Sequence, residues 1–258
     1  MIEVVPYNKN WPLMFESEKL KIQDVLKYNC IEIHHIGSTS VPGLDAKPKI
    51  DIIVVSKDRE NVIPKMELIG YQYKGEWNIP FKYGFAKRGE LDVNLHMFFD
   101  KNHPEIELNL GFRDYLRTHP EDLEAYKNIK YEILSDPSSH IKSGKLGVPL
   151  YTLRKRKFID GIIKQMGYDR LRVLKCLTDN EWLRAEQLYT HEIAISERED
   201  ENLEHFLLYK GIEILVYARI NLSLKSFKIF GNLSISELDF FNNLINNWIL
   251  CKFNKAQS

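Results

Sequence analysis

Cysteine is scarce in this chain, and no two cysteines have the spacing of a zinc ribbon or a redox centre. The three that occur, Cys30, Cys176 and Cys251, are widely separated and odd in number, which predicts reduced thiols in a cytoplasmic protein. Long apolar runs are also lacking, since residues 52–55 fall far short of the ~20 that cross a bilayer as a helix. The opening MIEVVPYNKNWPLMF lacks the unbroken apolar segment of a signal peptide. We therefore expect a soluble protein with no membrane partner.

An excess of charge of either sign is absent as well, because 36 Lys and Arg residues balance 36 Asp and Glu residues. No overall electrostatic field draws the chain to nucleic acid, so we expect no nucleic-acid partner. The 258 residues suffice for one large domain or two small ones, and we expect two. A homodimer is compatible with this composition.

The N-terminal part has the mixed periodicity of an α+β fold. Residues 11–26 repeat apolar positions at helical spacing, and residues 31–36 and 49–55 have the pattern of strands. The turn-rich stretch GSTSVPGLDAKP lies between those two strands. Three further strands are predicted, near Tyr71, at 81–86 and at 91–99. Further helices are predicted at 62–68, 108–116, 120–134 and 153–166.

The predicted strand at 91–99 has one polar face. Side chains two residues apart in a strand share a face, so Asp92, Asn94 and His96 point the same way. The apolar residues between them point to the other side. The polar face is a candidate lining for a site.

A change of composition after Gly167 predicts two domains, at residues 1–167 and 168–258. The second has a predicted strand at 171–176, a helix at 180–193, a hairpin at 204–222 and a helix at 236–253. Its smaller size and mixed elements favour an α/β unit.

The segment between the first two strands has the residues of a phosphate-binding loop. Gly37 lets the backbone approach an anion closely, and the hydroxyls of the next three residues supply hydrogen-bond donors. A compact positive charge follows at Lys47, and Asp51 is placed to hold a magnesium ion that accompanies the phosphate. The alternative is a tight turn whose hydroxyls cap their own backbone. The phosphate-binding residues of this hypothesis are Gly37, Ser38, Thr39, Ser40 and Lys47.

The string EIHHIGSTSVPGLDAKPKIDIIVV resembles the signature stretch of the GrpB family. The resemblance continues through PYNKNWPLMF, WNIP and GFRDYLRTHPEDLEAYKNIK and covers about residues 1–166. It implies a nucleotidyltransferase-like fold, with a mixed sheet flanked by helices. In the wider superfamily a Gly-Ser pair grips a triphosphate, and paired acidic residues on the next strand bind two magnesium ions.

The resemblance assigns those roles to Gly37, Ser38 and Asp51, but the second acidic position is occupied by Ile53. A lone aspartate rarely supports two-metal chemistry, so transfer is in doubt. Asp92 and His96 are the candidates to complete a ligand set with Asp51 for one Mg²⁺ ion, and all three are the candidate catalytic residues. The family usually has His-x-His where this chain has Asn94 and His96.

Three further groups complete the candidate site. His35 precedes the loop as an acid, base or orienting group, although a lone histidine is as often structural. Arg113 is the preferred additional phosphate ligand, because it lies in the FRDYLR motif of the resemblance. Arg117 and Lys82 are weaker candidates, since such charges usually face solvent.

The stretch EHFLLYKGIEILVYARINL resembles the strand pair before the cofactor site of GNAT acetyltransferases. Between Ile220 and Trp248 there is one glycine, Gly231, and no glycine-rich pyrophosphate loop. We expect a truncated or degenerate GNAT-like unit without an intact acetyl-CoA site.

The leading hypothesis is a protein that binds a nucleotide or another phosphorylated small molecule with a divalent metal, with nucleotidyl transfer left open. The first alternative is a noncatalytic accessory module related to coenzyme A metabolism. The second alternative is residual acyltransferase chemistry in the C-terminal part.

Overall fold

The computed structural model describes residues 2–143, 147–189 and 193–255. The chain forms two compact units. Unit 1 comprises residues 1–77, 81–141 and 149–166, and unit 2 comprises residues 78–80, 142–148 and 167–258.

Unit 1 is built on a five-stranded mixed sheet with the order β1-β2-β5-β4-β3. β2 pairs antiparallel with β1 and parallel with β5, and the remaining pairs are antiparallel. The strands are β1 (Cys30–Ile36), β2 (Lys49–Ser56), β3 (Gln72–Gly75), β4 (Tyr83–Lys87) and β5 (Asp92–Phe98). β2 is fully buried from Ile52 to Ser56, because both of its edges are paired and both of its faces are covered. This confirms the predicted α+β fold with a mixed sheet and flanking helices.

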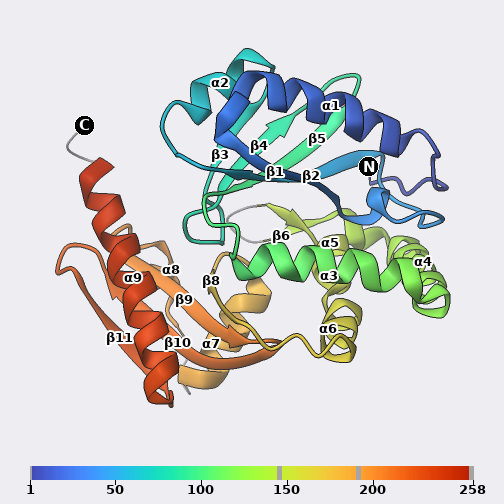
Figure 1. Ribbon diagram of the computed structural model, residues 1–258. Helices are drawn as coiled ribbons and strands as arrows, with labels where there is room; N and C mark the ends of the chain where they lie inside the picture. Colours follow the sequence, from blue (N-terminus) through green and yellow to red (C-terminus); the bar gives the residue numbers. More distant parts are fainter. Residues whose placement is uncertain (1, 144–146, 190–192, 256–258) are drawn as a thin grey trace. The chain divides into compact units, whose positions relative to one another are not determined.

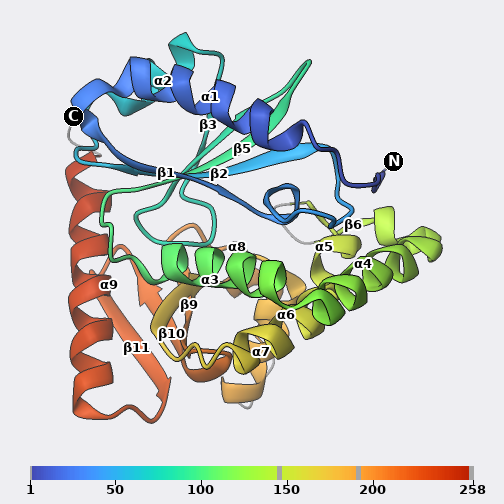
Figure 2. The same ribbon diagram turned by 45° about the vertical axis from the view of Figure 1, so that its right-hand side comes forward.

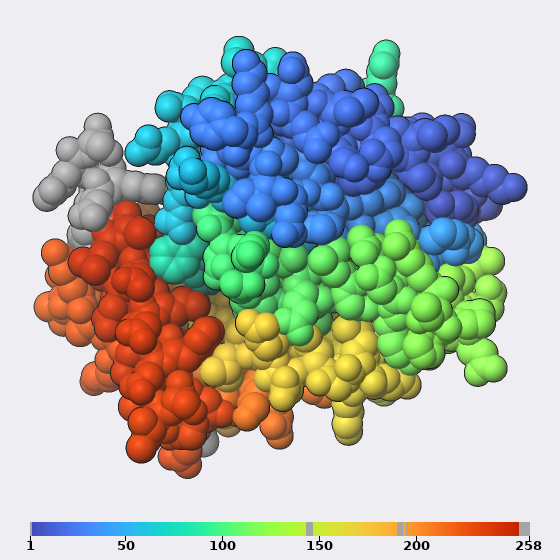
Figure 3. Space-filling view, viewed as in Figure 1, coloured from blue at the N-terminus to red at the C-terminus, as the bar shows by residue number. Residues whose placement is uncertain are grey.

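Helices cover both faces of this sheet (Figures 1 and 2). α1 (Trp11–Leu26) and α2 (Val62–Leu68) lie on one face, and α3 (Pro104–Thr118) lies on the other. The outer side of α1 is exposed in Figure 3 (dark blue), whereas its inner side buries Ile22 and Leu26 completely. The remaining helices of unit 1 are α4 (Pro120–Ser135), α5 (Leu150–Arg154) and α6 (Arg156–Gln165). Three short 3₁₀ turns join these elements, namely η1 (Lys27–Asn29), η2 (Ser38–Ser40) and η3 (Pro137–His140).

Two predicted helices differ from the observed ones. The helix expected from residue 108 begins at Pro104, because the ring of His103 accepts a hydrogen bond from the Glu105 amide and proline fits the first helical turn. The helix expected at 153–166 is two helices, α5 and α6, with Lys155 between them. Two short strands, β6 (Lys142–Ser143) and β7 (Val148–Pro149), precede α5 and pair with each other.

Unit 2 contains a four-stranded antiparallel sheet with the order β11-β10-β9-β8. Its strands are β8 (Leu171–Lys175), β9 (Leu203–Lys210), β10 (Glu213–Asn221) and β11 (Ser226–Gly231). Its helices are α7 (Asp179–Tyr189), α8 (Ile195–Glu199) and α9 (Ile235–Lys255). β9 and β10 form the predicted hairpin, whereas β11 was not predicted. Part of the predicted helix at 180–193, residues 190–192, lies outside the described residues.

No helix in the described part of the chain is both long enough and apolar enough to span a bilayer.

A buried ion pair fastens α1 to the end of β4. Glu18 is only 1% exposed and accepts hydrogen bonds from Lys87 at 2.8 Å and from Lys21 at 3.1 Å. Burial opposes ionisation of Glu18, but the hydrogen bonds from the two lysines outweigh it and lower the pKa of this carboxyl. The stabilisation is therefore present at neutral pH and is lost as the pH falls through the folded-state pKa.

We expect Lys87→Met to lower the free energy of unfolding by about 1–3 kcal/mol, because Glu18 would keep only one partner for a buried charge. Lys19→Met, which breaks the exposed pair with Glu16, should cost less than about 1 kcal/mol. Urea unfolding of both variants measures the difference. Equal losses would contradict the structural role given to Lys87.

Candidate functional site

The loop between β1 and β2 is held in place by a close contact of Gly37 with Asp51. Gly37 has φ +69°, and a Cβ atom at this position would lie 2.6 Å from Asp51 Oδ2. Only glycine combines that backbone conformation with this approach. The carboxylate on β2 therefore lies directly against the loop backbone.

Two of the three loop hydroxyls donate to the protein's own backbone. Ser40 Oγ donates to the Gly37 carbonyl at 2.6 Å, and Thr39 Oγ1 donates to the Lys49 carbonyl at 3.1 Å. Because the Thr39 hydroxyl donates its only proton to the Lys49 carbonyl, the contact of 3.0 Å between Thr39 Oγ1 and His35 Nε2 requires the ring to donate. His35 is 7% exposed and stacked on Phe15, and burial, with Arg117 and Arg113 nearby, lowers its pKa to about 4. His35 is therefore a neutral orienting group for Thr39.

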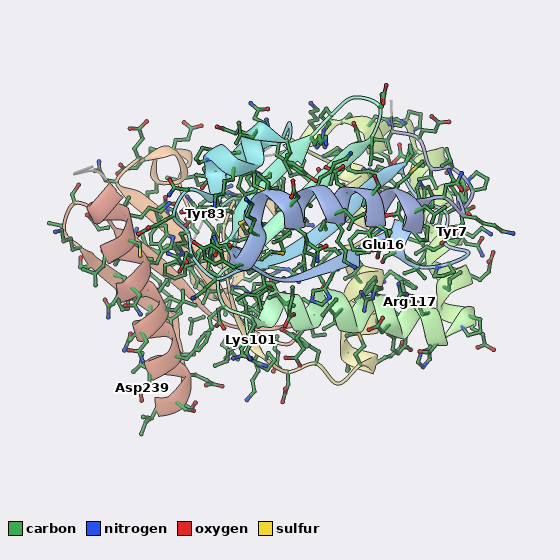
Figure 4. All side chains as sticks on the ribbon, turned by 45° about the horizontal axis from the view of Figure 1, so that its top comes forward. Tyr7, Glu16, Tyr83, Lys101, Arg117 and Asp239 are labelled. Carbon is green, nitrogen blue, oxygen red and sulfur yellow. The ribbon has the colours of Figure 1, made fainter. Side chains whose placement is uncertain are left out.

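Two arginines of α3 donate hydrogen bonds to backbone carbonyls just before the loop and within it. Arg113 donates to the His35 carbonyl at 3.0 Å, and Arg117 donates to the Ser40 carbonyl at 2.6 Å. Arg117 is labelled on α3 in Figure 4. Both guanidinium groups also pair with Asp114. Arg113, expected to reach a phosphate, contacts the backbone of β1 just before the loop.

A pocket of about 150 Å³ opens beside the loop within unit 1. It is lined by residues of the loop, of β2 and β5, of α4 and α5, and of the junction between α5 and α6. Of the described lining residues, four are lysines and one is acidic. The lining consists of Ser38, Thr39, Ala46, Lys47, Lys49, Asp51, Asn94, Lys130, Tyr151 and Lys155.

Two of the lysines lie close to one aromatic ring. The ammonium groups of Lys47 and Lys155 each lie 4.7 Å from the centroid of the buried Tyr151 ring. The electron-rich face of the ring attracts the cations, which partly offsets their mutual repulsion. Asp51 adds the opposite charge, and Asn94 donates to Asp51 Oδ1 at 2.9 Å and so fixes the carboxylate.

A third lysine lies below the loop. Lys130, on α4, is 1% exposed, and its Nζ lies 2.8 Å from Ser38 Oγ and 2.6 Å from the Asp45 carbonyl oxygen. The same Nζ is 4.5 Å from the centroid of the Tyr126 ring. Ser38 is therefore the loop hydroxyl whose near neighbour is a lysine.

Burial governs the charges of this pocket. It lowers the pKa of Lys130 to about 6, with a further contribution from Lys155. Burial likewise lowers the pKa of Lys47 and of Lys155 to about 8. Burial raises the pKa of Asp51, although Asn94 and three lysines oppose the change. The pocket therefore gains or loses protons near neutral pH.

Two predicted site residues lie apart from this pocket lining. Asp92 is at the start of β5 and pairs with Arg88 at 3.9 Å. His96 shares the polar face of β5 with Asn94, as predicted, but it lies opposite Ile53 and against Trp77. Burial and nearby Lys82 lower the pKa of His96 to about 3, so its ring is neutral. Lys82 itself is buried over the Trp77 ring rather than in the lining.

In the described ranges, no three His, Cys, Asp or Glu side chains are grouped so that they could hold a metal ion. Of the predicted phosphate-binding residues, Ser38, Thr39 and Lys47 line the pocket together with Asp51. Gly37 and Ser40 shape the loop.

Sequence reasoning missed Lys130, Tyr151 and Lys155. Lys130 was assigned to a solvent-facing helix, yet it follows the buried Tyr126 by four residues and so lies on the same helical face. A lysine in the apolar stripe of a helix was the available signal. Lys155 gave no such signal, because it lies between two helices that were predicted as one.

Residues 1–165 match the family model described as GrpB protein. The chain therefore belongs to the GrpB family.

Among its relatives, the UPF0157 protein BH1888 of Halalkalibacterium halodurans is 37% identical over 135 residues, which cover 51% of this chain and 69% of that protein. The UPF0157 protein YqkA of Bacillus subtilis is 36% identical over 135 residues, and the match spans only 39% of its length. A solved structure, described as the conserved protein GrpB from Enterococcus faecalis, aligns with a TM-score of 0.55 at 33% identity. That alignment covers 64% of this chain and 96% of the other.

We expect Gly37→Ala to lower the free energy of unfolding by about 2–5 kcal/mol, because a positive φ and a clash with Asp51 act together. Gly43→Ala is the matched control: its φ is +84°, but nothing lies within 4 Å of the added Cβ. The control should cost only about 1–2 kcal/mol. Denaturant unfolding compares the two, and equal losses would show that the contact with Asp51 imposes no constraint.

Proposed function

We propose that this protein binds the phosphate end of a phosphorylated small molecule, with nucleotides among the candidates. The observation that carries the proposal is the composition of the pocket, four lysines against one carboxylate beside a Gly-Ser loop. Such a lining attracts anions strongly where water is partly excluded. The resemblance of the loop to the GrpB family signature also supports the binding of a phosphate group.

The size of the pocket limits what enters it. Pockets that enclose a drug-sized ligand measure roughly 300–1,000 Å³. A cavity of about 150 Å³ accommodates one or two phosphoryl groups rather than a whole nucleotide. We infer that the organic part of the ligand stays outside the lysines.

A resident magnesium ion does not fit this lining. Mg²⁺ prefers oxygen ligands in an octahedral arrangement, and Asp51 is the one carboxylate among the described lining residues. The four lysines oppose a cation unless a phosphate comes with it. The ligand set of Asp51, Asp92 and His96 therefore stays a prediction.

Nucleotidyl transfer by the two-metal route is disfavoured for the same reason. Ile53, at the second acidic position of the wider superfamily, is fully buried in β2. The mixed sheet and the Gly-Ser loop are in keeping with a nucleotidyltransferase-like fold, whereas the carboxylates that this chemistry needs are not gathered at the pocket. A noncatalytic accessory module related to coenzyme A metabolism is the second candidate, favoured by Ile53.

For unit 2 we propose a structural role rather than acyl transfer. The residues that resemble an acetyltransferase form β9 and β10. Gly231 ends β11, where a Cβ atom would lie 2.7 Å from the Leu215 carbonyl oxygen. Close packing of the sheet thus accounts for this glycine without a pyrophosphate.

The binding proposal is tested by calorimetric titration with inorganic sulfate, with and without EDTA. We expect Lys155→Met to weaken binding at least about tenfold, because it removes one of the cations of the lining. Lys157→Met, two residues further along in α6, is the matched control, and its exposed side chain should leave the affinity unchanged.

The second arm of this experiment is Asp51→Asn. An anion pocket without a metal should bind sulfate more tightly, by roughly threefold or more, once the carboxylate charge is removed. Loss of binding in Asp51→Asn or in EDTA would contradict the proposal and restore the metal-dependent hypothesis.

Anion affinity should also fall as the pH rises through 8. The empty pocket loses protons from Lys47 and Lys155 near that pH, and a bound anion favours their protonated forms. Lys49 and Asp51 are the other charged groups at these two lysines. The dissociation constant should rise by up to about tenfold per pH unit for each proton taken up. Sulfate, whose charge is constant here, is the suitable probe, and a flat profile from pH 6 to pH 10 would contradict the assignment.

A further inference from the structure

We propose that Ser38 is a nucleophile with Lys130 as its general base, and that the pocket transfers a phosphoryl group through a phosphoserine at Ser38. The proposal deepens the binding function proposed above and rests on it. It assigns a reaction to a pair of residues that phosphate binding alone leaves unexplained.

The geometry of the pair is that of an activated serine. Ser38 Oγ lies 2.8 Å from Lys130 Nζ, within the range for direct proton transfer. Ser38 lines the pocket and directly follows Gly37, whose positive φ turns the chain sharply out of β1. A strand followed by a tight turn with an exposed hydroxyl is an arrangement that presents a nucleophile to a substrate.

Ser38 is distinguished from the two other hydroxyls of the loop. Ser40 Oγ donates to the Gly37 carbonyl, and Thr39 Oγ1 donates to the Lys49 carbonyl. Thr39 Oγ1 also lies 3.0 Å from His35 Nε2, but there the ring donates, so His35 does not take the Thr39 proton. Ser38 faces a lysine and, as a second neighbour, the Tyr126 hydroxyl.

Lys130 is suited to act as a base because its environment favours the neutral amine. The groups that face it are Lys155 from the junction of α5 and α6, Asp45 from the loop after η2, and Tyr126 from its own helix. Asp45 accepts from Tyr7 and Tyr131 through its carboxylate, and it presents its backbone carbonyl to Lys130. Burial and Lys155 together hold the pKa of Lys130 at about 6. In the structure Lys130 Nζ donates to both Ser38 Oγ and the Asp45 carbonyl. The neutral amine keeps the N–H to Asp45 and, after rotation about its C–N bond, accepts the Ser38 proton on its lone pair.

The reaction needs only the phosphorylated substrate and an acceptor, either water or an alcohol. Ser38 Oγ attacks the phosphorus of a phosphate ester or anhydride, and its proton passes to Lys130 Nζ. The bond from phosphorus to the leaving group breaks on the side opposite Ser38, and the leaving oxygen takes a proton from solvent. Lys47, Lys49 and Lys155 offset the negative charge of the phosphoryl oxygens during the attack. Water or an alcohol then attacks the phosphoserine and gives up its proton to solvent. The bond from phosphorus to Ser38 Oγ breaks, and Ser38 Oγ takes its proton back from the neighbouring Lys130 ammonium.

The test uses monofluorophosphate, a small dianion that carries a phosphoryl group and a good leaving group. The full chain is incubated with it, quenched in acid, digested and analysed by mass spectrometry. We expect the peptide containing Ser38 to gain the mass of one phosphoryl group, at a rate that rises with pH through about 6 as Lys130 loses its proton. Ser38→Ala should abolish the label.

Two lysine variants separate the base from a structural role. Lys130→Arg keeps a hydrogen-bond donor beside Ser38 but remains charged at neutral pH, so labelling should fall at least about a hundredfold. Lys127→Met, on the same helix with its Nζ near Asp45 and Glu124, should label at the wild-type rate. Circular dichroism confirms that each variant is folded.

The outcomes distinguish this proposal from the binding function. Sulfate binding without a label at Ser38 would overturn the nucleophile and leave the anion pocket intact. A label of wild-type rate in Lys130→Arg would overturn the role of Lys130 as base. Absence of sulfate binding would overturn the pocket itself.

Discussion

The site of unit 1 depends on the contact between the Asp51 carboxylate and the Gly37 backbone. This contact fixes the position of the loop against β2, and the loop places Ser38 and Thr39 in the lining of the pocket. A side chain at residue 37 would push the loop away from the strand. Asp51 therefore supports the loop by its position against Gly37 as well as by its negative charge. This structural role explains why one acidic residue lines a pocket with four lysines.

The lysines themselves are an unfavourable arrangement in the free protein. Four lysine side chains converge on a small cavity, and burial holds the pKa of three of them below the ordinary range. Natural folds tolerate such clusters mainly where a ligand relieves them, because uncompensated buried charge lowers stability. The rings of Tyr126 and Tyr151 supply part of the compensation until an anion arrives.

The sequence predicted the parts of the site that are local to the chain. The strand, loop and strand around Gly37, and the shared face of Asn94 and His96 on β5, follow from periodicity and turn chemistry alone. The positions of Lys130 on α4 and of Lys155 at the junction of α5 and α6 depend on how helices pack against the sheet, which periodicity does not report. His96 lies on the predicted face of β5 together with Asn94. Because it is two residues further along the strand, it does not line the pocket.

The position of Tyr151 has a spectroscopic consequence. Its ring centroid lies 4.7 Å from each of two ammonium groups whose protonation changes near pH 8 and, by the argument above, with an anion in place. The ultraviolet absorption of a phenol ring shifts with the electric field across it. The protein therefore contains a built-in chromophore at the wall of its pocket, and the charge state of the two lysines is readable in the optical spectrum without any added label.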